Sequence, residues 1–173
     1  MLLCAALLGS LLCACRSGAD ATAPVTDTAQ ALGVTAQAML DSHTAAPDTG
    51  SATAVAMSAA GAVVTGSGAQ AQQDGVVITA GGVYVLSGTL ADGRIVVNAP
   101  KQQVTLVLQD AAITCSTGSP LYVYKAAGVT VWLPEGTQSS LTDGSSYTFA
   151  DAYSSAQEEE PNACLYSKAD LVI

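Results

Sequence analysis

The same order of residues recurs three times in the second half of this chain: a run of aliphatic, strand-forming residues, a short break rich in Gly, Asp or Lys, and another aliphatic run. The copies begin at Arg94, Leu121 and Leu165. Val104 and Val129 hold equivalent places in two copies and are 25 positions apart. A repeat of this length cannot bury its own apolar face, so it folds only when copies stack on one another. The repeat therefore predicts an all-β solenoid.

Alternation inside the repeats predicts which side chains face the interior. Residues 129–133 alternate between apolar and other side chains, and residues 104–108 have the same phase. Successive strand residues point to opposite faces, so one set should be buried and the other turned outward. We expect the buried set to form stacked pairs, with Val104, Leu106 and Leu108 lying on Val129, Val131 and Leu133. Trp132 should then face outward.

Charge and length restrict the classes of partner. The chain has 173 residues, a formal net charge of −9 and only 5 Lys and Arg residues, which indicates one domain with extensions. No basic stripe is present that could neutralise a phosphate backbone, so nucleic acid is not an expected partner. An acidic protein also repels an acidic ligand unless a cation lies between them.

The N-terminal third indicates export. Residues 1–14 are almost wholly apolar and predict a signal peptide. Residues 12–15 (LCAC) resemble the lipobox of bacterial lipoproteins, which makes Cys15 the expected lipidation site and membrane anchor. An ordinary signal peptide cut near Ala14 is the alternative. Residues 15–50 contain few large apolar residues and predict a disordered tether behind the lipidated N-terminus. The mature protein should be membrane-anchored at the cell surface or extracellular.

Residues 51–173 carry strand-forming runs broken by Gly-rich turns, without helical periodicity, and form the expected β domain. Residues 144–162 interrupt its period, because Leu121 and Leu165 are 44 positions apart. This insertion should loop out from the solenoid, and loops on a rigid scaffold are where binding sites usually lie.

Acidic side chains in and near the insertion are candidate metal ligands. Calcium takes about six to eight oxygen ligands, and carboxylates supply them. The first choices are Asp151, Glu158, Glu159 and Glu160, with Asp143 and Asp170 as second choices. The alternative is that this acidic run is a solvated surface.

Three aromatic residues are candidate ligand-binding residues. If Leu121 faces inward, Tyr122 and Tyr124 face outward on the same coil as Trp132. Exposed aromatic rings are platforms on which the C–H face of a sugar packs. The alternative is that the insertion, through Tyr147, Phe149 and Tyr153, folds back over these rings.

Several runs together resemble a bacterial family of carbohydrate-binding domain-containing proteins. They are GVYVLSGTL (82–90), GRIVV (93–97), VTLVL (104–108), LTDGSSY (141–147), PNA (161–163) and SKADL (167–171). The resemblance implies a right-handed parallel β-helix similar to pectate lyases, truncated here after its first coils. It also implies calcium and an extracellular protein that binds plant cell-wall polysaccharide such as polygalacturonate or cellulose. This chain has Lys168-Ala169-Asp170 where the family tends to carry two consecutive aspartates. That difference weakens the case for one candidate metal ligand.

The expected function is therefore binding of polysaccharide at the cell surface, assisted by calcium. One alternative is an adhesive or structural surface protein whose β-solenoid presents loops to other proteins. The other is a polysaccharide lyase. No Ser/His/Asp set and no zinc-ligand spacing is present, so no catalytic residue is predicted.

Overall fold

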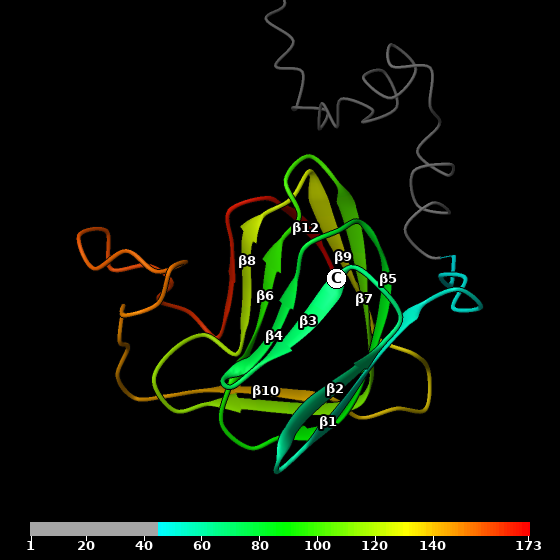
Figure 1. Ribbon diagram of the computed structural model, residues 1–173, viewed down its shortest axis with the longest axis horizontal. Helices are drawn as coiled ribbons and strands as arrows, with labels where there is room; N and C mark the ends of the chain where they lie inside the picture. Colours follow the sequence, from blue (N-terminus) through cyan, green and yellow to red (C-terminus); the bar gives the residue numbers. More distant parts are fainter. Residues whose placement is uncertain (1–44) are drawn as a thin grey trace, which may run out of the picture. The chain divides into compact units, whose positions relative to one another are not determined.

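The computed structural model describes residues 45–173, which form strands, turns and loops (Figure 1). The predicted signal peptide, Cys15 and most of the predicted tether lie outside the described residues. No helix long and apolar enough to cross a membrane is found in the part of the chain that the structure describes.

Residues 45–173 contain twelve strands. The strands are β1 (Thr53–Ser58), β2 (Gly61–Thr65), β3 (Ala69–Gln72), β4 (Gly75–Ile78), β5 (Gly82–Leu90), β6 (Arg94–Asn98), β7 (Gln103–Cys115), β8 (Leu121–Lys125), β9 (Gly128–Trp132), β10 (Ser140–Asp143), β11 (Leu165–Ser167) and β12 (Asp170–Val172). They are divided between two sheets. The first sheet has the order β12-β9-β7-β5-β1-β2, with β10 also paired to β7, and the second has the order β11-β8-β6-β4-β3.

The predicted right-handed parallel β-helix is wrong, because the all-β structure consists of two separate sheets that mix parallel and antiparallel pairs. Strands β1 and β2 pair antiparallel, and so do β3 and β4. Two-residue turns cause these reversals, and Gly61 and Gly75 follow them with φ of 114° and 135°. Two-residue loops typically join antiparallel neighbours, and a glycine adopts positive φ without a side-chain clash.

The 25-residue spacing is confirmed by parallel pairing within the first sheet. Strands β7 and β9 pair with Val104 opposite Val129 and Leu106 opposite Val131. The third expected pair is wrong, because β9 ends at Trp132 and Leu133 is 55% exposed. Strand β7 turns at Asp110, where φ is 52°, and its later half pairs with β10 instead.

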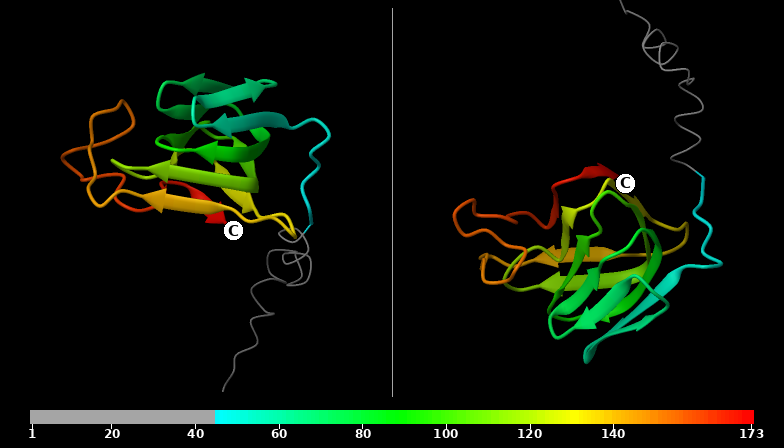
Figure 2. Two further views of the ribbon diagram at one scale, coloured as in Figure 1. Left: turned by 90° about the horizontal axis from the view of Figure 1, so that it is seen from below. Right: turned by 45° about the horizontal axis from the view of Figure 1, so that its top comes forward.

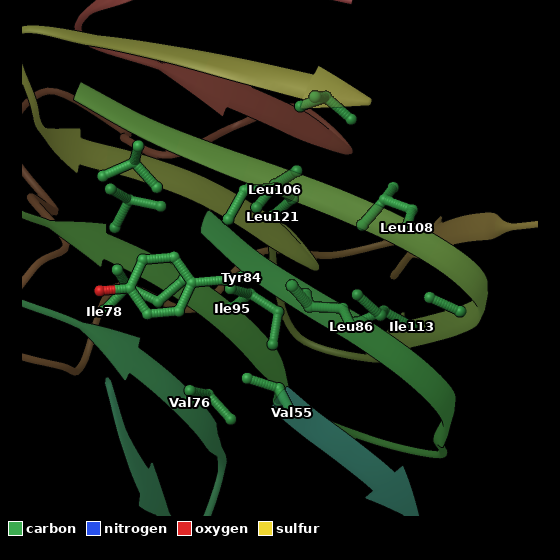
Figure 3. Packing of buried hydrophobic residues seen from close by; sticks show 14 of the residues in the cluster. Val55, Val76, Ile78, Tyr84, Leu86, Ile95, Leu106, Leu108, Ile113 and Leu121 are labelled. Atoms are coloured by element: carbon green, nitrogen blue, oxygen red, sulfur yellow. The ribbon is translucent and has the colours of Figure 1, made fainter. Parts of the chain in front are cut away.

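The core lies between the two sheets (Figure 3). The inward side chains of β5 and β7, such as Leu86, Leu106 and Ile113, face those of β4, β6 and β8, such as Ile95 and Leu121. Burying each large aliphatic side chain contributes about 1.5–3 kcal/mol. The stacked layers therefore supply a continuous apolar core that holds both sheets in place.

The insertion leaves the layers at one corner of this domain. It joins β10 to β11 and is drawn in orange on the outer side of the second sheet in both figures (Figures 1 and 2). Leu165 still pairs with Leu121 after the insertion, as Leu121 pairs with Ile95 one layer earlier. The extra residues therefore loop out, as predicted, without shifting the register of the sheet.

Candidate functional site

A row of large side chains crosses the outer face of the second sheet. Val77, Val96, Tyr122 and Tyr166 occupy successive strands in register. They alternate with core residues and point away from the core, yet Val77, Val96 and Tyr122 are buried. Outward side chains are buried only if another part of the chain covers them, and here the insertion does so.

The first half of the insertion is held to the sheet by three contacts. The Asp151 carboxylate Oδ2 lies 2.6 Å from Arg94 Nη1, and the side chains are 33% and 13% exposed. The Tyr122 hydroxyl donates to the Tyr153 carbonyl at 3.1 Å. The Thr148 N–H donates to the Thr117 carbonyl at 2.8 Å. Contacts spread over six residues fix the path of this segment over the sheet.

The second half of the insertion is held by Lys168. Its ammonium contacts the carboxylates of Glu160 and, at 3.7 Å, Glu158. The hydrogen bond from Lys168 lowers the pKa of Glu160, and the same bond raises the pKa of Lys168. Tyr166 also hydrogen-bonds Glu160, which raises the pKa of its hydroxyl. Contacts with Lys168 and Tyr166 therefore hold the second half of the insertion in place.

This contact predicts a pH dependence in the second half of the insertion. The lowered pKa of Glu160 means that the pair stabilises the fold above the ordinary value of 4.5, and the stabilisation is lost as pH falls through the lowered pKa. We expect amide exchange of residues 155–160, measured by NMR, to accelerate over that range. Glu160→Gln should remove the pH step, whereas Glu159→Gln, at the exposed neighbour, should keep it. If the pH step in amide exchange persists in Glu160→Gln, other carboxylates cause it.

A cleft of about 400 Å³ lies where the insertion meets the outer face of β4 and β6. Val77 and Val96 contribute apolar surface, and Tyr153 contributes an aromatic ring. The remaining lining is largely polar and comes from the β3–β4 turn, the start of β6, the β7–β8 corner and the insertion: Gln72, Gln73, Asp74, Asp92, Arg94, Thr117, Thr148 and Asp151. The volume is in the range of about 300–1,000 Å³ that is usual for small-molecule sites.

The charges of the cleft are unequal. Among its described lining residues Arg94 carries the one positive charge, against the carboxylates of Asp74, Asp92 and Asp151. The backbone N–H and the hydroxyl of Ser116 both donate to Asp92 and lower its pKa, so Asp92 is ionised at neutral pH. Both terminal nitrogens of Arg94 are engaged, one by Asp151 and the other by Cys115 Sγ at 3.9 Å.

The candidate metal ligands are not brought together. No three His, Cys, Asp or Glu side chains within residues 45–173 form a group that could hold a metal ion. Asp151 binds Arg94, while Glu158 and Glu160 contact Lys168. Asp143 accepts a hydrogen bond from Tyr147 at 2.5 Å, and burial together with this contact raises the pKa of Tyr147 to about 12. Glu159 and Asp170 are exposed at separate places. These residues, as arranged here, do not fit a calcium ion.

The candidate aromatic residues lie on two different sheets. Tyr122 and Tyr124 belong to β8, with ring centroids 5.9 Å apart, and Tyr153 packs on Tyr124 at 5.4 Å. Trp132 belongs to β9 of the first sheet, so it shares no face with them. The prediction that the insertion covers the tyrosines is confirmed for Tyr122, which has no exposed surface. Tyr124 is only partly covered, and Trp132 remains half-buried on the other sheet.

Of the residues around the cleft, the sequence pointed to Asp151 as a candidate metal ligand and to Tyr153 as part of a cover for the aromatic rings, but not to a common site. A usable pattern was present, because an Asp-Gly pair stands at the start of both strands: Asp74–Gly75 ends in the first residue of β4, and Asp92–Gly93 directly precedes β6. In the structure Arg94 lies opposite Gly75, and its N–H donates to the Asp74 carbonyl at 2.8 Å. Two Asp-Gly turns before parallel neighbours place their carboxylates at the same edge of a sheet.

Comparison with known proteins gives three similarities. The family described as carbohydrate-binding domain-containing protein matches residues 72–173, which include every residue that lines the cleft. A carbohydrate-binding domain-containing protein of Acetivibrio thermocellus is 38% identical over 92 residues, which are 53% of this chain and 31% of that protein. A polysaccharide lyase-like protein from C. thermocellum, solved as a gadolinium derivative, has a TM-score of 0.63 and 30% identity, covering 69% of this chain and 48% of that one.

This chain therefore spans less than half the length of both relatives. The family match nevertheless covers more than half of this chain and includes the insertion and four strands of the second sheet, β4, β6, β8 and β11. The family expected from the sequence is confirmed: the chain belongs to the carbohydrate-binding domain-containing family.

Proposed function

We propose that this protein binds a polysaccharide in the cleft between the insertion and the second sheet. The observation that supports this proposal is the lining of the cleft, which combines an apolar surface and a tyrosine with side-chain amides, carboxylates and hydroxyls. A sugar ring presents C–H groups on its faces and hydroxyls at its rim, so it needs both kinds of surface. Membership of the carbohydrate-binding domain-containing family agrees with this ligand class.

The same geometry favours binding over polysaccharide cleavage. A lyase needs a group that removes a proton from the sugar, and Arg94 is the basic residue of the cleft. Its guanidinium is engaged by Asp151 and Cys115. Cleavage by a lyase releases unsaturated uronates, whose absorbance would appear if this proposal were wrong and the cleft were catalytic.

Plant cell-wall polymers, cellulose and polygalacturonate, are the ligands proposed for test. Calcium assistance stays a prediction. Asp151, Glu158 and Glu160 already form ion pairs with Arg94 and Lys168, so we expect binding in the cleft to persist when a chelator is added. We further propose that the protein acts at the cell surface, exported and held through lipid on Cys15. Unchanged membrane retention of Cys15→Ser would contradict that anchor.

The proposal predicts that a bulky side chain in the cleft abolishes binding. Thr117 is exposed, lines the cleft and uses its carbonyl, not its side chain, to hold Thr148. We expect Thr117→Trp to weaken retention on insoluble polysaccharide by about tenfold or more, since it fills the space a sugar needs. The measurement is a pull-down on cellulose and on polygalacturonate, with and without chelator.

Two further variants make this result specific. Gln138→Trp adds the same ring at an exposed corner residue outside the cleft and should bind as the wild type does. Trp132→Ala tests the outer face of the first sheet. Loss of binding in Trp132→Ala with retention in Thr117→Trp would move the site to that face. Binding to neither polymer by the wild type would favour an adhesive scaffold.

A further inference from the structure

We infer that Asp151 determines the ligand preference of the cleft: by holding the charge of Arg94 it makes the cleft bind uncharged sugar rings more tightly than uronates. This inference rests on the proposed function. It concerns which sugars enter the cleft, and it follows from the geometry of one carboxylate.

Each oxygen of the Asp151 carboxylate has a separate role. Oδ2 contacts the Arg94 guanidinium at 2.6 Å. Oδ1 accepts hydrogen bonds from the Tyr153 N–H at 2.8 Å, the Ser154 N–H at 2.9 Å and the Ser154 hydroxyl at 2.8 Å. One oxygen thus shapes the turn of the insertion while the other neutralises Arg94.

The negative charge that remains in the cleft determines which sugars bind there. With Arg94 neutralised by Asp151, the carboxylates of Asp74 and Asp92 are left on the walls of the cleft. A uronate entering it would meet these like charges and would have to displace Asp151 to reach Arg94. Displacement would also break the hydrogen bonds that Oδ1 makes within the turn. An uncharged hexose meets neither obstacle.

Asp151→Asn separates the two roles. The amide oxygen still accepts the hydrogen bonds of the turn, but the negative charge beside Arg94 is gone. Affinity for a uronate should rise by about tenfold or more, because a hydrogen bond between charged groups contributes about 1.5–3 kcal/mol. Affinity for the uncharged sugar should change by less than about threefold.

The experiment uses the full chain and two matched pairs of hexasaccharides that differ only in charge. One pair is hexagalacturonate and its carboxyl-reduced form; the other is cellohexaose and its C6-oxidised form. Calorimetry gives the ratio of the two affinities within each pair. Asp74→Asn is the matched control, because it removes one negative charge that lines the cleft from the β3–β4 turn and leaves Arg94 bound to Asp151.

The expected result is a wild type that prefers the uncharged member, a preference lost in Asp151→Asn and largely kept in Asp74→Asn. An unchanged ratio in Asp151→Asn, or an equal shift in Asp74→Asn, would overturn the inference while leaving sugar binding in the cleft intact. Failure of the wild type to bind any of the four sugars would overturn the proposed function and this inference with it.

Salt dependence tests the inference without relying on the fold of a variant. Screening weakens repulsion and attraction alike. Raising the salt concentration should therefore increase the affinity of the wild type for the charged sugars and leave the uncharged sugars unaffected. Uronate affinity of the wild type that falls with salt would contradict the assignment of Asp151.

Discussion

Leu106→Ala is expected to lower the free energy of unfolding by about 3 kcal/mol. Leu106 has no exposed surface and lies in the middle of the first sheet, opposite Tyr84 on β5 and Val131 on β9. Truncation leaves a cavity that the parallel neighbours on both sides cannot fill without leaving their register. Denaturant unfolding, followed by the fluorescence of the single tryptophan and by circular dichroism, would measure the loss.

Leu133→Ala is the matched control. The alternation of residues 129–133 predicts that Leu133 is as buried as Leu106, whereas the structure exposes 55% of it beyond the end of β9. We expect this substitution to change the free energy of unfolding by no more than about 0.5 kcal/mol. Equal losses in the two variants would show that Leu133 is buried and that β9 does not end at Trp132.

Gly75→Ala is expected to destabilise the protein by more than about 4 kcal/mol, at the upper end of single substitutions. Gly75 has a φ of 135°, and a Cβ there would lie 1.9 Å from the Arg94 carbonyl oxygen. That atom belongs to the neighbouring backbone and cannot rotate away. The start of β4 would have to separate from β6, next to the cleft, so unfolding and sugar binding should both be affected.

Gly61→Ala isolates the part of this effect that comes from backbone conformation. Gly61 follows the β1–β2 turn as Gly75 follows the β3–β4 turn, and its φ is 114°, but no atom lies within 4 Å of its Cβ position. Conformational strain alone should destabilise by about 1–3 kcal/mol. The difference between the two variants measures the close approach of β4 and β6. Equal effects would show that backbone strain accounts for both.

The sequence predicted the strands and their spacing better than their topology. Apolar runs at a constant spacing determine register, so the pairing of Val104 with Val129 followed from the sequence. The direction of a strand depends on the turn before it, and the turns at Ala59–Ala60 and Gln73–Asp74 reverse the chain. Those turns lack the Asn-Gly or Asp-Gly pair inside the loop that most strongly predicts a hairpin.

The candidate site was predicted only in part, because it depends on contacts between distant residues. The insertion was identified from the broken period, and its packing over Tyr122 was one of two alternatives. Nothing in the sequence links Arg94 to Asp151, which are 57 positions apart. Carboxylates that were candidate metal ligands form ion pairs with Arg94 and Lys168 instead, and a sequence alone does not show such pairs.

At the corner between β10 and β11 the number of residues in the chain can change without altering how the strands of the sheet pair. Leu165 pairs with Leu121 across 44 positions as regularly as Leu121 pairs with Ile95 across 26. The entropy of closing a loop rises by only about 0.6 kcal/mol for each doubling of its length. Segments of other lengths and chemistry could therefore be exchanged at this corner, giving new binding specificities on an unchanged scaffold.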